Sequence, residues 1–182
     1  MNTFKILLSA VALAAFGTAW AGPIPDPQDS ATGFKSFDLP SAQTGVFEMS
    51  FNATPLADKI DAFTGISAGT PTSAADVSAI VRFNDSGKID VRNGNAFRAD
   101  QSLGYSANKV YRMRMVVDVA RRTYSVFVTA PDQAEIALAK DYAFRTTGPV
   151  PSLGKIVLAG FNGRDGYFPG PHRITGVTVK AM

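Results

Sequence analysis

Apolar and polar residues alternate along most of this chain, a pattern typical of β-strands that bury one face. In residues 46–52, the side chains of Phe47, Met49 and Phe51 fall on one side of an extended backbone. Because successive side chains of a strand point to opposite faces, this alternation predicts a half-buried strand. The same period of two recurs in residues 77–84, 88–92, 111–119, 123–128 and 174–179. No stretch has a convincing helical period, and residues 73–79 and 132–140 come nearest to one.

Turn-forming residues separate these runs. Asn84-Asp85-Ser86-Gly87 joins two of the predicted strands, and Ala120-Arg121-Arg122 joins the two with the clearest alternation. Short strands linked by tight turns are typical of antiparallel sandwiches. We therefore expect an all-β fold, an antiparallel two-sheet β-sandwich of jelly-roll type. In such a fold residues 174–179 would return to pair beside the N-terminal strand.

Three segments also resemble parts of a known superfamily. Residues 82–91 look like the central hairpin of concanavalin A-like, laminin G-like jelly rolls, residues 111–128 look like the next hairpin, and residues 173–179 resemble the closing strand. The resemblance to this lectin/glucanase superfamily covers most of residues 34–180 and rests on strand rhythm and turn placement. It implies two curved sheets, with a glycan bound or cleaved on the concave face.

Residues 1–21 have the three parts of a secretory signal in order. Lys5 precedes an uncharged apolar run over residues 6–16, and Ala19-Trp20-Ala21 supplies the small residues of a cleavage site. The apolar run is shorter than the roughly 20 residues that cross a bilayer. We expect cleavage after Ala21, a secreted or periplasmic location and no membrane span in the mature chain. An uncleaved N-terminal anchor is the alternative.

The remaining chain divides once. Residues 22–33 form a Pro-rich N-terminal segment, interpreted as a short tether or an initial strand, and residues 34–182 form a single β-sandwich domain. The chain has no cysteine, so the exported domain must be stabilised by its core alone. The only tryptophan, Trp20, lies in the leader. The mature domain therefore lacks the side chain that most often forms sugar-stacking platforms.

The net charge of +3 is small for a protein that binds nucleic acid, which usually has a dense basic face. It is compatible with an acidic polysaccharide, and we expect a glycan partner and no nucleic acid. No cofactor is expected, because one histidine and no cysteine leave little for a zinc site. Structural calcium is a weak alternative in residues 84–90 and 162–166, where the turn-forming role of Asn, Asp and Gly explains the composition without metal.

Carboxylates give little support to glycoside hydrolysis, which needs two acids flanking the scissile bond. The chain has two glutamates, Glu48 and Glu135, far apart in sequence, while Asp58 and Asp61 are expected in a loop after Pro55. A polysaccharide lyase instead needs a cation to neutralise a uronate and a residue to move a proton. Its candidates are Arg82, Arg112 or Arg114 for the first role and Tyr167 or His172 for the second. The Gln-Ile-His sequence of alginate lyases of this fold is absent.

Non-catalytic binding has its own candidates. Four arginines fall on the solvent-facing parity of predicted strands and would line one face if those strands adjoin: Arg82, Arg92, Arg112 and Arg114. Asn95 follows Arg92 in a polar turn, with donors suited to hydroxyls. Aromatic platforms are expected among side chains near loops: Tyr105, Tyr142, Tyr167 and Phe168. Tyr111 and Tyr124 have core parity. A secreted, non-catalytic carbohydrate-binding module is the leading hypothesis, and a uronate lyase or a structural or interaction protein of the cell envelope are the alternatives.

Overall fold

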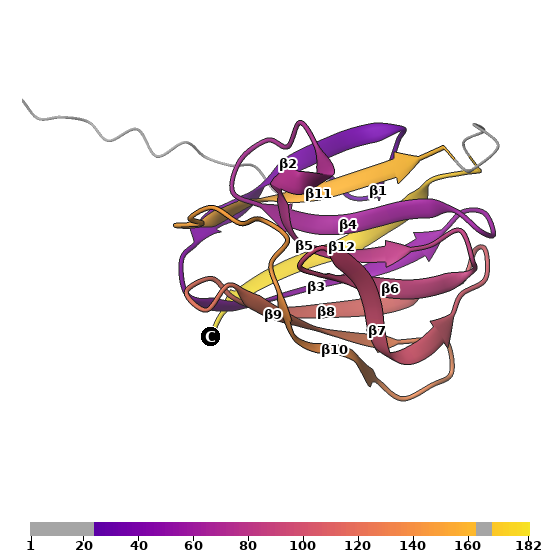
Figure 1. Ribbon diagram of the computed structural model, residues 1–182. Helices are drawn as coiled ribbons and strands as arrows, with labels where there is room; N and C mark the ends of the chain where they lie inside the picture. The colour runs from indigo at the N-terminus through magenta and orange to yellow at the C-terminus, as the bar shows by residue number, and fades with distance from the viewer. Residues whose placement is uncertain (1–23, 163–168) are drawn as a thin grey trace, which may run out of the picture.

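The computed structural model describes residues 24–162 and 169–182, in which two six-stranded antiparallel sheets pack face to face (Figure 1). Sheet A has, in spatial order, β1 (Gln28–Asp29), β12 (His172–Ala181), β3 (Val46–Pro55), β8 (Tyr111–Asp118), β9 (Thr123–Thr129) and β10 (Ile136–Ala143). Sheet B has β2 (Gly33–Gln43), β11 (Leu153–Phe161), β4 (Asp61–Ser67), β5 (Val77–Phe83), β6 (Lys88–Asn93) and β7 (Ala96–Gly104). The predicted two-sheet jelly-roll sandwich is thus confirmed.

Helical structure among the described residues is limited to one 3₁₀ turn, η1 (Ala74–Asp76). No helix in this part of the chain is long and apolar enough to cross a membrane.

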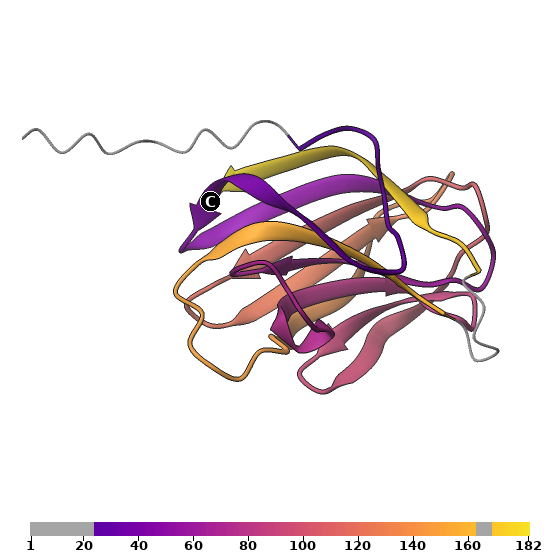
Figure 2. The same cartoon turned by 90° about the horizontal axis from the view of Figure 1, so that it is seen from above.

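Each of the six alternating runs forms a strand. They become β3, β5, β6, β8, β9 and β12. The last of these lies between β1 and β3, with Ile174 opposite Gln28 and Thr178 opposite Ser50, so the closing strand does return beside the N-terminal strand. Figure 2 shows the yellow C-terminal strand running beside the indigo N-terminal part of the chain.

The core lies between the sheets and contains the side chains that the alternation places there. Phe47, Met49 and Phe51 of β3 are buried. Tyr111 of β8 and Tyr124 of β9, which also point into the core, are buried as well. Burying a large apolar side chain contributes about 1.5–3 kcal/mol. In a chain without disulfides, this packing is the main source of stability.

Five strands escape the sequence pattern, namely β2, β4, β7, β10 and β11. Most residues of β4 and β11 are buried on both faces of the sheet. On the outer face of sheet B, Phe34 and Ala74 pack over Phe63 and Val157. With both faces buried, the period of two disappears. Asp61 therefore begins a strand rather than lying in a loop, and β10 occupies the end of the segment that came nearest to a helical period.

The N-terminal segment is docked rather than loose. Gln28–Asp29 pair with β12, and the Asp29 carboxylate forms two hydrogen bonds with the Arg173 guanidinium, at 2.7 and 2.8 Å. Ser30 is buried, and the amide of Gly160 in sheet B donates to the carbonyl of Ala31. Of the two interpretations from sequence, the initial strand describes this segment better than the tether.

Candidate functional site

The four candidate arginines lie on two opposite surfaces. Arg82 and Arg92 belong to β5 and β6 and lie on the outer face of sheet B, whereas Arg112 and Arg114 belong to β8 and lie on the outer face of sheet A. Because the whole sandwich separates these faces, the arginines cannot line one surface together, as their shared parity had suggested.

Arg82 is fully engaged with its neighbours. Its Nε and Nη2 donate to the two carboxylate oxygens of Asp90 at 2.9 and 2.8 Å, and its Nη1 donates to Asp61 at 3.4 Å. Burial opposes the charge, but the hydrogen bonds and the negative charge of Asp90 outweigh it, and the pKa of Arg82 is raised. Its guanidinium carbon also lies 3.6 Å from the centroid of the Phe97 ring. This arginine therefore stabilises the face of sheet B and has few donors left for a ligand.

Arg114 is engaged in the same way on the other face. It donates to both oxygens of Glu135 and to Glu48, and it packs over the ring of Phe127. The hydrogen bond from Arg114 lowers the pKa of the Glu135 carboxyl. The two glutamates, distant in sequence, thus meet around one guanidinium as its ion-pair partners.

The other three candidate side chains, Arg92, Asn95 and Arg112, have fewer partners within the protein. The Arg92 Nε donates to the carbonyl of Gly94 at 3.0 Å, which leaves its two terminal nitrogens. Asn95 is exposed at the turn between β6 and β7. Arg112 is exposed and lines a hollow of about 270 Å³ on sheet A together with Ser50, Asn52 and Thr178.

His172 is a structural residue in this fold. It is fully buried, with Nδ1 3.0 Å from the Ser30 hydroxyl and Nε2 2.8 Å from the Thr64 hydroxyl. Burial lowers its pKa to about 4, so the ring is neutral at physiological pH. This serine–histidine contact has no access to solvent, so a polymer cannot reach His172 for proton transfer. Tyr167, its proposed companion, lies outside the described residues.

The described aromatic platforms are also buried. Tyr105 donates its hydroxyl to the carbonyls of Ile60 and Asn84, and Tyr142 donates to Asp100. Their exposed fractions are 8% and 7%, too small for either ring to stack on a sugar. Phe168 falls outside the described residues.

The oxygen-rich turn between β5 and β6 is occupied by its own hydrogen bonds. The Asn84 Oδ1 accepts from the amides of Ser86 and Lys88, and its Nδ2 donates to Asp90. In residues 24–162 and 169–182, no group of three or more His, Cys, Asp or Glu side chains is placed to hold a metal ion. Most of the second candidate calcium loop, residues 162–166, lies outside the described residues.

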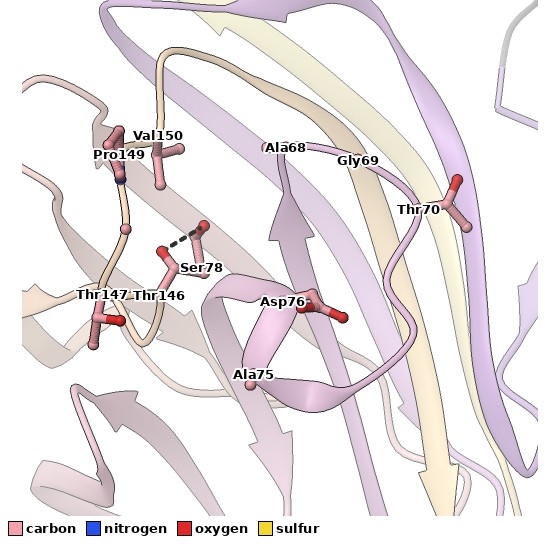
Figure 3. A pocket seen from close by; sticks show the side chains of 11 residues that line it. Ala68, Gly69, Thr70, Ala75, Asp76, Ser78, Thr146, Thr147, Pro149 and Val150 are labelled. Atoms are coloured by element: carbon pink, nitrogen blue, oxygen red, sulfur yellow. Dashed lines mark hydrogen bonds between the residues drawn. The ribbon is translucent and has the colours of Figure 1, made fainter.

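A polar cleft at one end of sheet B was not predicted. It has a volume of about 440 Å³ and lies between residues 68–76 and 146–150 (Figure 3). Its lining is rich in hydroxyl groups and small residues: Ala68, Gly69, Thr70, Ala75, Asp76, Ser78, Thr146, Thr147, Gly148, Pro149 and Val150. The hydroxyls of Ser78 and Thr146 meet at 3.2 Å and tie the second wall to β5. The middle of the same outer face is filled by buried Phe63, Ile80 and Val157, so the accessible hollow lies at its end.

Local hydrogen bonds hold both walls of the cleft. Asp76 accepts from the amides of Thr72 and Ser73 through Oδ2, at 2.9 and 2.8 Å, and so caps η1. These bonds lower the pKa of the Asp76 carboxyl and keep it ionised. All of these bonds fall on Oδ2, which leaves Oδ1 as an acceptor. On the other wall, Arg122 donates to the carbonyls of Thr146 and Thr147.

Comparisons with known proteins agree with this architecture. No family model matches the chain. A gellan lyase from Bacillus sp. is 28% identical over 130 residues, which is 62% of this chain but 5% of that protein. Among solved structures, a sialidase is 17% identical with a TM-score of 0.57, covering 86% of this chain and 15% of that one. Lectin II from Ulex europaeus is 11% identical with a TM-score of 0.53, covering 83% of this chain and 82% of the lectin. The chain therefore has the jelly-roll fold of the concanavalin A-like lectin and glucanase superfamily, as its strand pattern predicted.

Proposed function

We propose that this protein is an exported, non-catalytic glycan-binding module whose ligand lies in the cleft between residues 68–76 and 146–150. The observation that carries the proposal is the lining of the cleft, which combines the hydroxyls of Thr70, Thr146 and Thr147 with the Asp76 carboxylate, while the buried Ser78 supports Thr146 from below. Sugar hydroxyls both donate and accept hydrogen bonds, and this lining offers both kinds of partner. The volume of about 440 Å³ lies in the range of about 300–1,000 Å³ that is usual for ligand sites.

The names of the similar proteins point to glycans as well. One is a lyase named for the polysaccharide gellan, and another is a lectin with the same two-sheet fold. This chain spans about one-twentieth of the gellan lyase, so the activity of that whole protein is not carried over. The likeness supports a module of this size working on glycans, and the leader-like residues 1–21 support export.

The chemistry of the described residues favours binding over cleavage. A lyase needs an exposed group that accepts a proton, and His172 is buried and neutral. Tyr105 and Tyr142 are buried as well, and burial raises the pKa of both phenols, that of Tyr142 to about 12. Arg82 and Arg114, the candidate neutralisers of a uronate, already hold carboxylates of the protein.

The gellan lyase match keeps a polysaccharide lyase as the second candidate. Cleavage by such an enzyme leaves unsaturated ends that absorb ultraviolet light. Incubation of the purified protein with gellan and with a panel of uronate polymers tests it directly. A steady rise in absorbance would replace the binding proposal with the lyase, and a flat trace on every polymer removes the lyase.

Blocking the cleft tests the binding proposal. A Cβ added at Gly69 meets nothing within 4 Å, so Gly69→Trp places a large ring at the cleft without a backbone clash. The matched control is Gly45→Trp, a position equally free of contacts in the turn between β2 and β3. In affinity electrophoresis through polysaccharide gels, we expect Gly69→Trp to weaken retention by about tenfold or more and Gly45→Trp to leave it unchanged. No retention of the unmodified protein by any acidic or neutral polysaccharide, or equal retention of both variants, contradicts the proposal.

A further inference from the structure

Two arginines lie next to each other beside the cleft. Arg145 directly precedes Thr146 and Thr147 of the cleft wall, and its amide donates to the carbonyl of Ser78 at 2.9 Å. Arg92 ends the outward-facing row of β6. The turn that follows Arg92 is hydrogen-bonded to the strand before Arg145, because Gly94 donates to the carbonyl of Ala143 at 3.0 Å. These backbone hydrogen bonds bring the segments that carry the two arginines close together, near enough for the charge of Arg145 to act on Arg92.

Neither of these arginines has a carboxylate partner among the described residues. Arg82, Arg114 and Arg173 each form an ion pair, whereas Arg92 and Arg145 form none in this part of the chain. Burial, and then the positive charges of Arg145 and Arg82, lower the pKa of Arg92. Because Asp90 already offsets the charge of Arg82, the excess positive charge remains with Arg92 and Arg145. Two like charges without a counter-ion favour a bound anion.

Phe97 restrains the side chain of Arg92. The guanidinium carbon of Arg92 lies 4.8 Å from the centroid of the Phe97 ring, and Gly94 accepts from its Nε. These contacts restrain the guanidinium while Nη1 and Nη2 stay without a partner among the described residues. A restrained planar fork suits paired hydrogen bonds to a planar carboxylate.

We infer that Arg92 and Arg145 together bind the carboxylate of an acidic sugar whose ring occupies the adjoining cleft, so that the ligand is a uronate-bearing polysaccharide. This inference rests on the proposed glycan-binding function and names the class of its ligand. The hydroxyl-lined cleft would hold the sugar ring, and the two arginines would select the sugar that carries a negative charge.

The test compares an acidic polymer with its neutral counterpart. The intact purified protein is titrated with polygalacturonate and with the same polymer after chemical reduction of its carboxylates to alcohols. We expect binding to the acidic form to be about tenfold tighter or more, and to weaken as salt rises. Arg92→Gln and Arg145→Gln should each lose most of this preference while keeping the affinity for the reduced polymer.

Arg121→Gln is the matched control. Arg121 also lies near the end of the sandwich, but its side chain is 83% exposed and its contact with Asp118 is weak, at 3.7 Å. It should leave both affinities unchanged. Equal binding of the two polymers, or an unchanged preference in Arg92→Gln and Arg145→Gln, overturns the carboxylate site. If the carboxylate site is overturned but Gly69→Trp still weakens binding, the glycan-binding function stands without the carboxylate site. Absence of binding to every polymer contradicts the function itself and this inference with it.

Discussion

The single histidine of the chain shows how an individual side chain can be used to join distant segments. His172 contacts Ser30 of the N-terminal segment and Thr64 of β4, and it begins β12, so three parts of the fold meet at one neutral ring. Its backbone amide also donates to the Ser30 hydroxyl at 3.0 Å. The consequence of this placement is a dependence of stability on pH.

Acid should destabilise the fold through His172. Its pKa is about 4 in the folded protein, against an ordinary value of 6.5 for a solvated histidine. Above pH 6.5 the ring is neutral in the folded and the unfolded chain, and the group has no effect. Between pH 6.5 and 4 the unfolded chain takes up a proton that the folded chain refuses, so the free energy of unfolding falls by up to roughly 3 kcal/mol. Urea unfolding of the native protein and of His172→Gln across this range measures it.

The His172→Gln variant should lose this part of the slope, although it is less stable at neutral pH. An identical pH dependence in both proteins would show that other groups cause it.

Gly65 is a second residue whose environment makes a sharp prediction. A Cβ there would lie 2.5 Å from Cγ1 of Val77 and 2.7 Å from the carbonyl oxygen of Ala79. Gly65→Ala should therefore lower the free energy of unfolding by about 1–3 kcal/mol, as overpacking does. Gly104→Ala is the control, because its Cβ would meet one atom at an ordinary 3.7 Å. Similar denaturation midpoints for the two variants would argue against the close approach of β4 and β5.

For single residues, the sequence predicts which side chains are buried better than it predicts which side chains form ion pairs. The parity of Phe47, Tyr111 and Tyr124 was enough to place them in the core. The contacts of Arg82 with Asp61 and of Arg114 with Glu48 were not predicted, because each depends on a strand outside the hairpin that carries the arginine. Asp90, in contrast, lies directly opposite Arg82 in the predicted hairpin. Arg145 was missed because it lies in a loop without any periodic pattern.

Among the elements, β5 and β6 are joined at one end by a side chain from the other sheet. Their ladder covers Val81–Phe83 opposite Ile89–Val91, and at its end the Tyr124 hydroxyl enters from sheet A. This hydroxyl accepts from the Ile80 amide at 3.1 Å and lies in hydrogen-bonding contact with the carbonyls of Ile80 and Arg92. It therefore joins the two sheets and holds the end of β6 near the proposed arginine site.

Removing this hydroxyl should loosen the end of β6. Tyr124→Phe leaves buried backbone groups without a partner, and we expect a loss of about 1–3 kcal/mol in the free energy of unfolding. Amide exchange at Ile80 should accelerate, which identifies the change as local. Tyr142→Phe, which loses one bond to the less buried Asp100, should cost less. Equal losses in the two variants would show that the bridge has no special role.

Most of the strands predicted from the alternating pattern have one face that is more exposed to water than the other, and β5, which is buried on both faces, is an exception. The strands β3, β8 and β9 alternate strictly between buried and less buried residues. In contrast, most residues of β4 and β11 are buried on both faces, because Phe34 of β2 and Ala74 of η1 cover the outer face of these strands. The cleft was not predicted because its Gly, Ser and Thr residues are common in any surface loop. The hollow forms only when two loops that are distant in sequence fold beside each other.

On the scale of the whole molecule, local rhythm does not reveal which sheet a strand joins. Sequence placed Arg82, Arg92, Arg112 and Arg114 on solvent-facing positions correctly, but their division between two outer faces depends on long-range pairing. Arg112→Gln should therefore leave glycan binding at the cleft unchanged in the same gel assay. A loss comparable to that of Arg92→Gln would support a site on sheet A instead.

The pairing of β3 has a consequence for how the chain is made. Its two neighbours in sheet A are β8 and β12, which are both synthesised much later. At ordinary elongation rates, the edge of β3 that pairs with β12 waits roughly ten seconds for its partner, because β12 is the last strand of the chain. During that interval this edge of sheet A presents unpaired backbone N–H and C=O groups, which can pair with another chain. The topology thus leaves sheet A incomplete until nearly all of the chain has been translated, whereas β4, β5, β6 and β7 of sheet B pair in the order of synthesis.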